Sequence, residues 1–148
     1  MAGKYIIVVG CGRLGSILAN RLSKDGHSVV VIDRDANAFR KLSAEFSGYR
    51  IHSNTVEIAA LREAQIDRAD CLLATTDQDN VNMMVAQIAR TIFHVPVVLA
   101  RAYEPAHEFI YHELDVKIIS PTHLAADAFF EALSATLQEP PERFLEDG

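Results

Sequence analysis

The stretch Tyr5–Gly15, YIIVVGCGRLG, decides the fold of this chain. Its first five residues favour a strand, and an apolar run of this length that ends in glycine is typical of a buried parallel strand. The residues that follow space their apolar side chains as a helix does, with one face formed by Leu14, Ile17, Leu18 and Leu22. The glycines at positions 10, 12 and 15 therefore lie on a strand-to-helix turn, where the pattern G-x-G-x-x-G has physical meaning.

Each glycine of this turn has its own role in binding a phosphate group. Gly10 permits the tight turn, Gly12 lets the phosphate approach the backbone, and Gly15 lets the helix lie close to the strand. The start of the helix offers free N–H groups and the positive end of its dipole. Arg13 adds a cation to the turn, unless it only faces solvent at an exposed helix start.

A second apolar run, His27–Ile32, ends at Asp33, which follows Gly15 by 18 residues. The acid that binds a ribose in Rossmann folds follows the glycines by roughly 20 residues. Its carboxylate accepts hydrogen bonds from both ribose hydroxyls and would repel a 2′-phosphate, which disfavours NADP. The alternative is that Asp33 caps the next helix, but Asp35 is better placed for that and leaves Asp33 free. Strand, turn, helix, strand and acid together predict nucleotide binding.

Length and composition indicate one ordinary globular domain. The chain has 148 residues, of which 49% are hydrophobic and 23% are charged, and its net charge is −6. This acidic balance argues against binding to nucleic acids or membrane surfaces. We find neither a signal peptide nor an apolar stretch of transmembrane length, and the two cysteines fall on separate predicted elements. We therefore expect a soluble protein of the cytoplasm.

Strands and helices alternate along the chain. The predicted strands are 4–9, 28–33, 49–53, 71–75, 96–100 and 116–119, and the predicted helices are 13–25, 36–46, 56–64, 79–93, 105–113 and 121–138. This alternation predicts an α/β fold, a Rossmann-like doubly wound parallel sheet of strand order 3-2-1-4-5-6. Its ligand crevice would lie at the carboxyl ends of strands one and four. Residues 1–138 form the expected domain, and residues 139–148 a polar tail or linker.

Polar residues follow the third, fourth and fifth predicted strands, on the expected ligand side. Asn54 would read an adenine edge, and Thr75, Thr76 and Asp77 would face the ribose and phosphates. The alternative is that these side chains cap the helices that follow them. For any one of these residues the sequence favours neither interpretation.

The final predicted helix is apolar on more than one face. Its only charged residues are Asp127 and Glu131, whereas its apolar residues are Leu124, Ala125, Ala128, Phe129, Phe130, Ala132, Leu133, Ala135 and Leu137. A surface helix normally carries a single apolar stripe. The helix is therefore either enclosed in the domain or covered by a partner. We favour the partner, because a six-stranded fold of this type does not need an enclosed terminal helix.

The sequence carries no recognisable catalytic motif. It lacks a G-x-S-x-G elbow, a Walker lysine and a cysteine-pair metal motif, and its six histidines are scattered. His107 and His112 are five residues apart, a poor spacing for metal binding on a helix. Arg101 and Glu104 would form a structural ion pair, or a link between the nucleotide and the helix predicted at 105–113, rather than an acid/base pair. A dehydrogenase also needs a substrate domain, so we predict a protein that is not an enzyme.

Three motifs resemble one known family. They are the GCGRLG turn with Asp33, the segment LREAQIDRADCLLATTDQDNVN at 61–82, and the segment LDVKIISPTHLAADAF at 114–129. Together with the neighbouring stretches they are similar to the N-terminal lobe of RCK domains, the regulators of K⁺ conductance, also called KTN or TrkA-N domains. The likeness covers about residues 4–137.

The resemblance implies a non-catalytic sensor of NAD(H) or of an adenine nucleotide such as ATP, ADP or AMP. Such lobes pair through their last helices and form rings under a K⁺ channel or transporter, at the inner face of the membrane. Where many members have Gly-Asp after the third strand, this chain has Ser53-Asn54, and Arg34 is an additional contact. The resulting candidate site residues are Gly10, Cys11, Gly12, Arg13, Leu14, Gly15, Asp33, Arg34, Ser53, Asn54, Thr75, Thr76, Asp77 and Arg101.

Two other functions remain open at this stage. One is a small NAD-dependent oxidoreductase that borrows its substrate site from a partner chain. The other is a Rossmann-like scaffold that dimerises with an empty site. Full members of the family usually continue into a small C-terminal lobe, so we expect either a piece of a longer chain or a subunit whose C-lobe is a separate polypeptide. The sequence leaves open the nucleotide, the membrane partner, the ring size and the sign of regulation.

Overall fold

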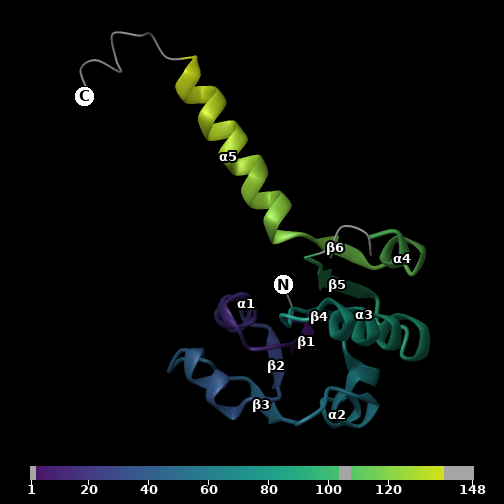
Figure 1. Ribbon diagram of the computed structural model, residues 1–148. Helices are drawn as coiled ribbons and strands as arrows, with labels where there is room; N and C mark the ends of the chain where they lie inside the picture. The colour runs from purple at the N-terminus through teal and green to yellow at the C-terminus, as the bar shows by residue number, and fades with distance from the viewer. Residues whose placement is uncertain (1–2, 104–107, 139–148) are drawn as a thin grey trace.

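Six parallel strands form one sheet in the order β3-β2-β1-β4-β5-β6 (Figure 1). The computed structural model describes residues 3–103 and 108–138. The strands are β1 Tyr5–Val9, β2 Ser28–Asp33, β3 Tyr49–His52, β4 Cys71–Ala74, β5 Val97–Arg101 and β6 Lys117–Ile119. The predicted fold class and strand order are confirmed. The order reverses at β1 and β4, so the carboxyl ends of these strands open a crevice.

Helices cover both faces of this sheet. They are α1 Arg13–Lys24, α2 Ile58–Glu63, α3 Asp79–Gln87, α4 Glu108–Glu113 and α5 Pro121–Leu137, with the short 3₁₀ segments η1 Ala36–Lys41 and η2 Ile66–Arg68 and the π-helical segment η3 Ile88–Ile92. Helix α3 runs directly into η3.

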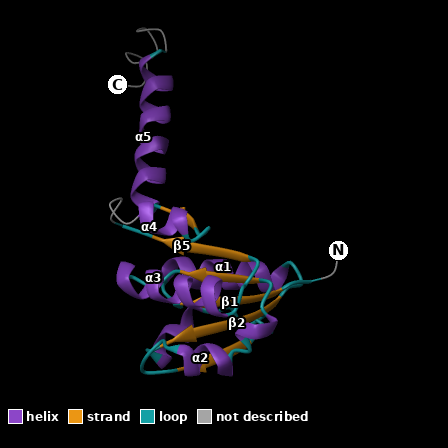
Figure 2. Ribbon diagram, turned by 90° about the vertical axis from the view of Figure 1, so that its right-hand side faces the viewer, coloured by secondary structure: helices purple, strands orange, loops and turns teal. Residues whose placement is uncertain are grey.

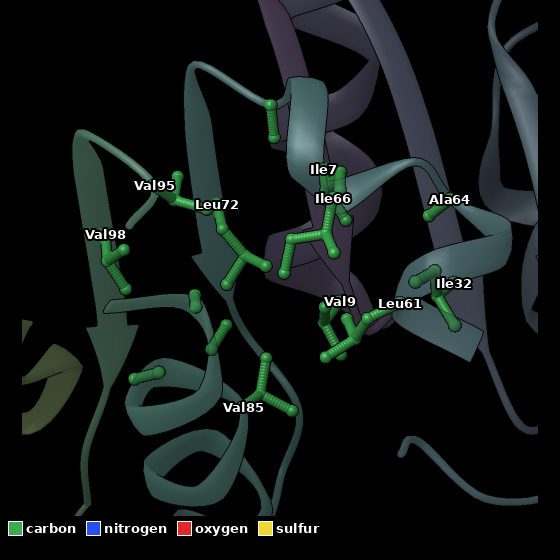
Figure 3. Close-up of a cluster of buried hydrophobic side chains, with 14 of the residues drawn as sticks. Ile7, Val9, Ile32, Leu61, Ala64, Ile66, Leu72, Val85, Val95 and Val98 are labelled. Atoms are coloured by element: carbon green, nitrogen blue, oxygen red, sulfur yellow. The ribbon is translucent and has the colours of Figure 1, made fainter. Parts of the chain in front are cut away.

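Alternate residues of each central strand face opposite layers. One layer joins Ile7 and Val9 of β1 to residues of α2, η2 and α3, among them Leu61 and Val85 (Figure 3). The other layer joins Ile6 and Val8 to side chains of α1 and η1 and of the chain after η1, namely Ala19, Ala38, Leu42 and Phe46. Because both faces of β1 are covered, the sequence of this strand is one unbroken apolar run.

The predicted helix at 36–46 is wrong in type and length. The structure has a 3₁₀ segment, η1, which ends at Lys41. Side chains of α1 bind the backbone beyond it: Ser43 N–H donates to Asn20 Oδ1 at 2.9 Å, and Ser47 N–H donates to Ser23 Oγ at 3.2 Å. These donors therefore need no helical carbonyl as a partner.

Other predicted boundaries shift by less. The predicted helix at 79–93 is α3 followed by η3, where Phe93 N–H donates to Ile88 O at 3.3 Å, a π-helical bond. The predicted helix 56–64 shortens to α2, and the predicted third strand ends at His52. The start of the predicted helix at 105 and the predicted tail at 139–148 lie outside the described residues.

Helix α5 projects from the edge of the sheet as an arm (Figures 1 and 2). Ser120 caps its start, Pro121 occupies its first turn, and none of its residues is buried. Of its large hydrophobic side chains the two aromatic ones are the most exposed, with 78% of Phe129 and 72% of Phe130 accessible. The domain therefore does not enclose this helix. In the described part of the chain, no helix has the length and apolar character needed to cross a bilayer.

Candidate functional site

A cleft of about 620 Å³ opens at the carboxyl ends of β1, β2, β4 and β5. This is the edge at which open parallel sheets bind their ligands. Its lining residues are Gly10, Gly12, Arg13, Ile32, Asp33, Arg34, Asp35, Ala38, Asn54, Thr55, Val56, Thr75, Thr76, Asp77, Gln78, Val81, Met84, Arg101 and Tyr103.

The three glycines of the first turn have different surroundings. Gly10 has a φ of +100°, and a Cβ there would lie 2.9 Å from Thr76 N. A Cβ on Gly15 would collide with the carbonyl group of Gly10. A Cβ on Gly12 would meet no atom within 4 Å, so this glycine faces open space on the cleft side. The geometry thus agrees with the separate roles expected for a tight turn, a close helix and an approaching phosphate.

The start of α1 is open. Gly12 is the N-cap residue, no side chain caps the helix, and its first turn contains no acidic residue. The first helical bond runs from Ser16 N–H to Gly12 O at 2.9 Å. The N–H groups before it cannot bond within the helix, so they are available to an anion. Arg13, which is exposed and lines the cleft, adds a positive charge at the same place.

Asp33 closes β2 beside this turn, and both of its carboxylate oxygens are engaged. Oδ2 accepts a hydrogen bond from Cys11 N–H and Oδ1 accepts one from Asp35 N–H, each at 2.7 Å. Asp35 in turn caps η1 by accepting a bond from Asn37 N–H at 2.9 Å, as predicted. The sequence interpretation expected Asp33 to be free of contacts within the protein. The structure shows instead that both of its oxygens bind backbone N–H groups. A carboxylate oxygen accepts more than one bond, so capacity for a ribose hydroxyl remains on each oxygen.

Cys11 lies on the turn but does not line the cleft. Its side chain is completely buried, and burial, followed by the nearby charge of Asp33, raises the pKa of its thiol to about 11. The thiol stays neutral at physiological pH and is no nucleophile. Cys11 thus contributes its backbone N–H group to the site through Asp33.

The opposite wall is tied to the glycine turn through Thr75. Its Oγ1 donates to the carbonyl oxygens of Val9 and Gly10 at 3.0 and 3.1 Å. The next residue, Thr76, is bound by the buried amide of Asn82 on α3. The sequence analysis did not predict a role for Asn82. A polar amide on the inward face of a predicted helix could have indicated a buried hydrogen-bonding residue.

Arg101 ends β5 and lies over the ring of Tyr103, with its guanidinium carbon 4.6 Å from the ring centroid. Its Nε is buried and, among the described residues, has no hydrogen-bond partner. Both side chains line the cleft, and Tyr103 was not predicted. The pair places a cation and an aromatic face on one wall. Glu104, the expected ion-pair partner of Arg101, lies outside the described residues.

Ten of the predicted site residues line the cleft together: Gly10, Gly12, Arg13, Asp33, Arg34, Asn54, Thr75, Thr76, Asp77 and Arg101. Four do not line it: Cys11, Leu14, Gly15 and Ser53. Ser53 turns its hydroxyl to the carbonyl oxygen of Thr55 at 2.7 Å, so it shapes the loop. Within residues 3–103 and 108–138, no three acidic, histidine or cysteine side chains are grouped as a metal site would require.

A comparison with known protein families shows to which family this chain belongs. Residues 6–121 match the TrkA-N domain. The chain belongs to the TrkA-N domain family. The resemblance inferred from the sequence is therefore confirmed, and this TrkA-N domain includes the glycine turn, Asp33 and both walls of the cleft.

Two curated relatives are named for potassium uptake. This TrkA-N domain is 38% identical over 136 residues to the Trk system potassium uptake protein TrkA of Streptomyces coelicolor. It is 32% identical over 123 residues to the TrkA homolog of Methanothermobacter thermautotrophicus. These alignments cover 92% and 82% of the chain but only 61% and 56% of the relatives. The chain thus spans about three fifths of their length.

Solved structures share the fold of this TrkA-N domain. The TrkA-N domain of the inner membrane protein ybaL from Escherichia coli has a TM-score of 0.78 at 20% identity, with 88% of this chain and 97% of that one covered. The GsuK channel bound to NAD has a TM-score of 0.75 at 21% identity, with 90% and 24% covered. A Kef C-terminal domain of Shewanella denitrificans in its AMP-bound form has the same TM-score at 21% identity, with 97% and 87% covered.

Proposed function

We propose that this chain is a nucleotide-sensing regulatory domain of a potassium channel or transporter and that it is not an enzyme. The observation that carries the proposal is the cleft at the start of α1, where Gly12 faces open space beside a helix end that no side chain caps. An anionic group fits there because backbone N–H groups and the helix dipole both favour it.

The residues present fit a nucleotide. The space at Gly12 would take a phosphate group, and the carboxylate of Asp33 would accept hydrogen bonds from a ribose. Arg101 lines the cleft, so its guanidinium would donate hydrogen bonds to a ligand there. Asn54 would lie near the base. NAD(H), ATP, ADP and AMP all carry an adenosine and a phosphate that match these features.

The choice of ligand class has support from proteins of the same fold. Structures of GsuK are described with NAD and with ADP, and the Kef domain is described with AMP. Their identities to this chain are 21%, 16% and 21%, so they indicate which nucleotides the fold accepts elsewhere. For this chain NAD(H) or an adenine nucleotide is the proposed ligand.

Regulation would follow from a difference in binding between two arrangements of the assembly. A ligand shifts such an equilibrium only by its differential affinity for the two arrangements. In the proposal, two copies pair through α5 and further copies form a ring on a membrane subunit that conducts or transports K⁺, at the cytoplasmic face. The support is the exposed apolar surface of α5 and the naming of two relatives as Trk potassium uptake proteins.

Mass spectrometry of the small molecules released from the purified, denatured protein tests the ligand directly. We expect a dinucleotide or an adenine nucleotide at a ratio near one per chain. A parallel absorbance assay of the protein with NADH and candidate carbonyl substrates separates a sensor from an oxidoreductase. Binding without turnover supports the sensor. Steady oxidation of NADH would favour the oxidoreductase, and a site that neither retains nor binds any of these compounds would favour a bare scaffold.

A further inference from the structure

Asn82 on α3 is a fully buried polar residue that does not line the cleft. A buried carboxamide destabilises a protein unless its donors and its acceptor find partners. Here Oδ1 accepts bonds from Thr76 N–H at 3.0 Å and from Thr76 Oγ1 at 2.6 Å. Nδ2 donates to the carbonyl oxygens of Thr76 and Arg101 at 3.0 and 2.9 Å. One side chain thus makes four hydrogen bonds, three to Thr76 in the loop after β4 and one to Arg101 at the end of β5.

These bonds join two neighbouring parts of the cleft. Thr76 belongs to the loop after β4 and Arg101 ends β5, and both residues line the cleft. Oδ1 and Nδ2 lie on one planar group, so beyond the last pair of β4 and β5, Ala74 with Ala100, this amide ties the position of Thr76 to that of the Arg101 carbonyl group. A ligand that holds Thr76 in place therefore also restrains the backbone of Arg101.

The connection continues from Arg101 to the arm. Ala102 N–H donates to Ile119 O at 3.1 Å, which joins the end of β5 to the end of β6. Ser120 follows and caps α5 by accepting a bond from His123 N–H at 3.4 Å. Figure 1 shows β5, β6 and the base of α5 in succession at one edge of the sheet. A contiguous set of hydrogen bonds thus leads from the cleft to the first turn of the arm.

We propose that Asn82 is a positioning residue that transmits occupation of the cleft to the base of α5. The inference rests on the proposed nucleotide site and adds the element through which that site acts. The ligand contacts Thr76 and Arg101, and the amide ties the loop after β4 to the end of β5. The bond from Ala102 N–H to Ile119 O then links β5 to β6 and the start of α5. Networks of this kind carry coupling between sites when both ends bias the same arrangement.

The test is hydrogen–deuterium exchange with NADH as the probe, read by mass spectrometry on peptides from the cleft (72–82) and from the β6–α5 junction (116–126). In the unmodified chain, NADH is expected to slow exchange in both peptides. Asn82→Asp keeps an acceptor for Thr76 but removes the donors to two carbonyl oxygens. At NADH concentrations that saturate each variant, we expect Asn82→Asp to keep the response in the cleft and to lose it at the junction.

Asn20→Asp is the matched control. Asn20 also bridges two segments through its amide, donating to Lys41 O at 3.3 Å and accepting from Ser43 N–H at 2.9 Å, but it does not line the cleft. This variant should respond to NADH at both peptides as the unmodified chain does. Thr76→Val removes the 2.6 Å bond from the other end and should also lose the junction response, which keeps the test valid if Asn82→Asp does not fold.

The outcomes separate this inference from the proposed function. If the unmodified chain binds neither NADH nor ADP, the nucleotide site itself is contradicted, and this inference falls with it. If it binds NADH but the junction never responds, only the role of Asn82 is overturned. The same holds if the junction responds in Asn82→Asp and Thr76→Val as strongly as in the unmodified chain. Loss of the junction response in both variants, with Asn20→Asp unaffected, supports it.

Discussion

The carboxylate of Asp33 and the backbone N–H of Cys11 form a 2.7 Å hydrogen bond that joins the end of β2 to the glycine turn. The acid expected to bind the ribose therefore also holds the turn expected to bind the phosphate. Substitution of Asp33 should affect both functions, and the two effects can be measured separately.

Asp33→Ala should weaken the binding of NADH or ADP by about 1.5–3 kcal/mol, the value of a hydrogen bond to a charged group. Isothermal titration calorimetry measures this loss, and thermal unfolding without ligand measures the effect on the turn. The exposed Asp67, on η2 and away from the cleft, provides the control Asp67→Ala. Unchanged affinity in Asp33→Ala would remove the ribose role from this residue.

Gly12→Ala and Gly15→Ala form a pair with opposite expected results. A methyl group at Gly12 meets no protein atom within 4 Å, so stability should change by less than about 1 kcal/mol, while the methyl group occupies the space assigned to a phosphate and affinity falls. A methyl group at Gly15 collides with the carbonyl of Gly10, which should cost at least about 1–3 kcal/mol of stability. Denaturant unfolding and calorimetry on both variants check the pair. Full nucleotide affinity in a folded Gly12→Ala protein would argue against a phosphate at this position.

Stability at alkaline pH should depend on Cys11. Burial and Asp33 raise the pKa of this thiol from 9.0 to about 11, so between these values the unfolded chain loses a proton that the folded chain retains. The free energy of unfolding should therefore fall as the pH rises from about 9 to about 11, by about 2–3 kcal/mol from this group. Urea unfolding across this range should show a flatter profile in Cys11→Ala. Identical slopes in the two proteins would contradict the raised pKa.

The arm should mediate pairing of the protein. Phe129→Glu places a charge on a side chain that is 78% exposed in a single copy, so the fold should be retained and self-association lost. Multi-angle light scattering after size-exclusion chromatography measures the mass of the unmodified chain and the variant. Tyr49→Glu, at an aromatic residue that is 76% exposed on β3, is the matched control. A dimer that persists unchanged in Phe129→Glu would place the contact elsewhere.

The parts of this fold that were predictable from sequence depend on local patterns. The apolar run before Gly10 predicts a strand covered on both faces, and the alternation of strands and helices then predicts the strand order. Ten candidate residues meet in one cleft because the carboxyl ends of parallel strands share an edge.

The remaining features depend on contacts between distant segments. Asn82 lies 19 residues from Arg101, whose carbonyl group it binds, and only the folded sheet brings them together. The stacking of Arg101 on Tyr103 is a local contact, but it follows from the direction the chain takes after β5, which the sequence pattern does not specify. The 3₁₀ form of η1 depends on side chains of α1 that bind the following backbone, which helix propensity does not encode.

The central claim is that the open start of α1 and the acid that ends β2 hold a nucleotide together. Calorimetric titration of the purified chain with NADH, ADP and NADPH tests it most directly. The account predicts saturable binding of NADH or ADP at one site per chain, and weaker binding of NADPH because Asp33 repels its 2′-phosphate. Absence of saturable binding for both NADH and ADP at millimolar concentration would contradict it.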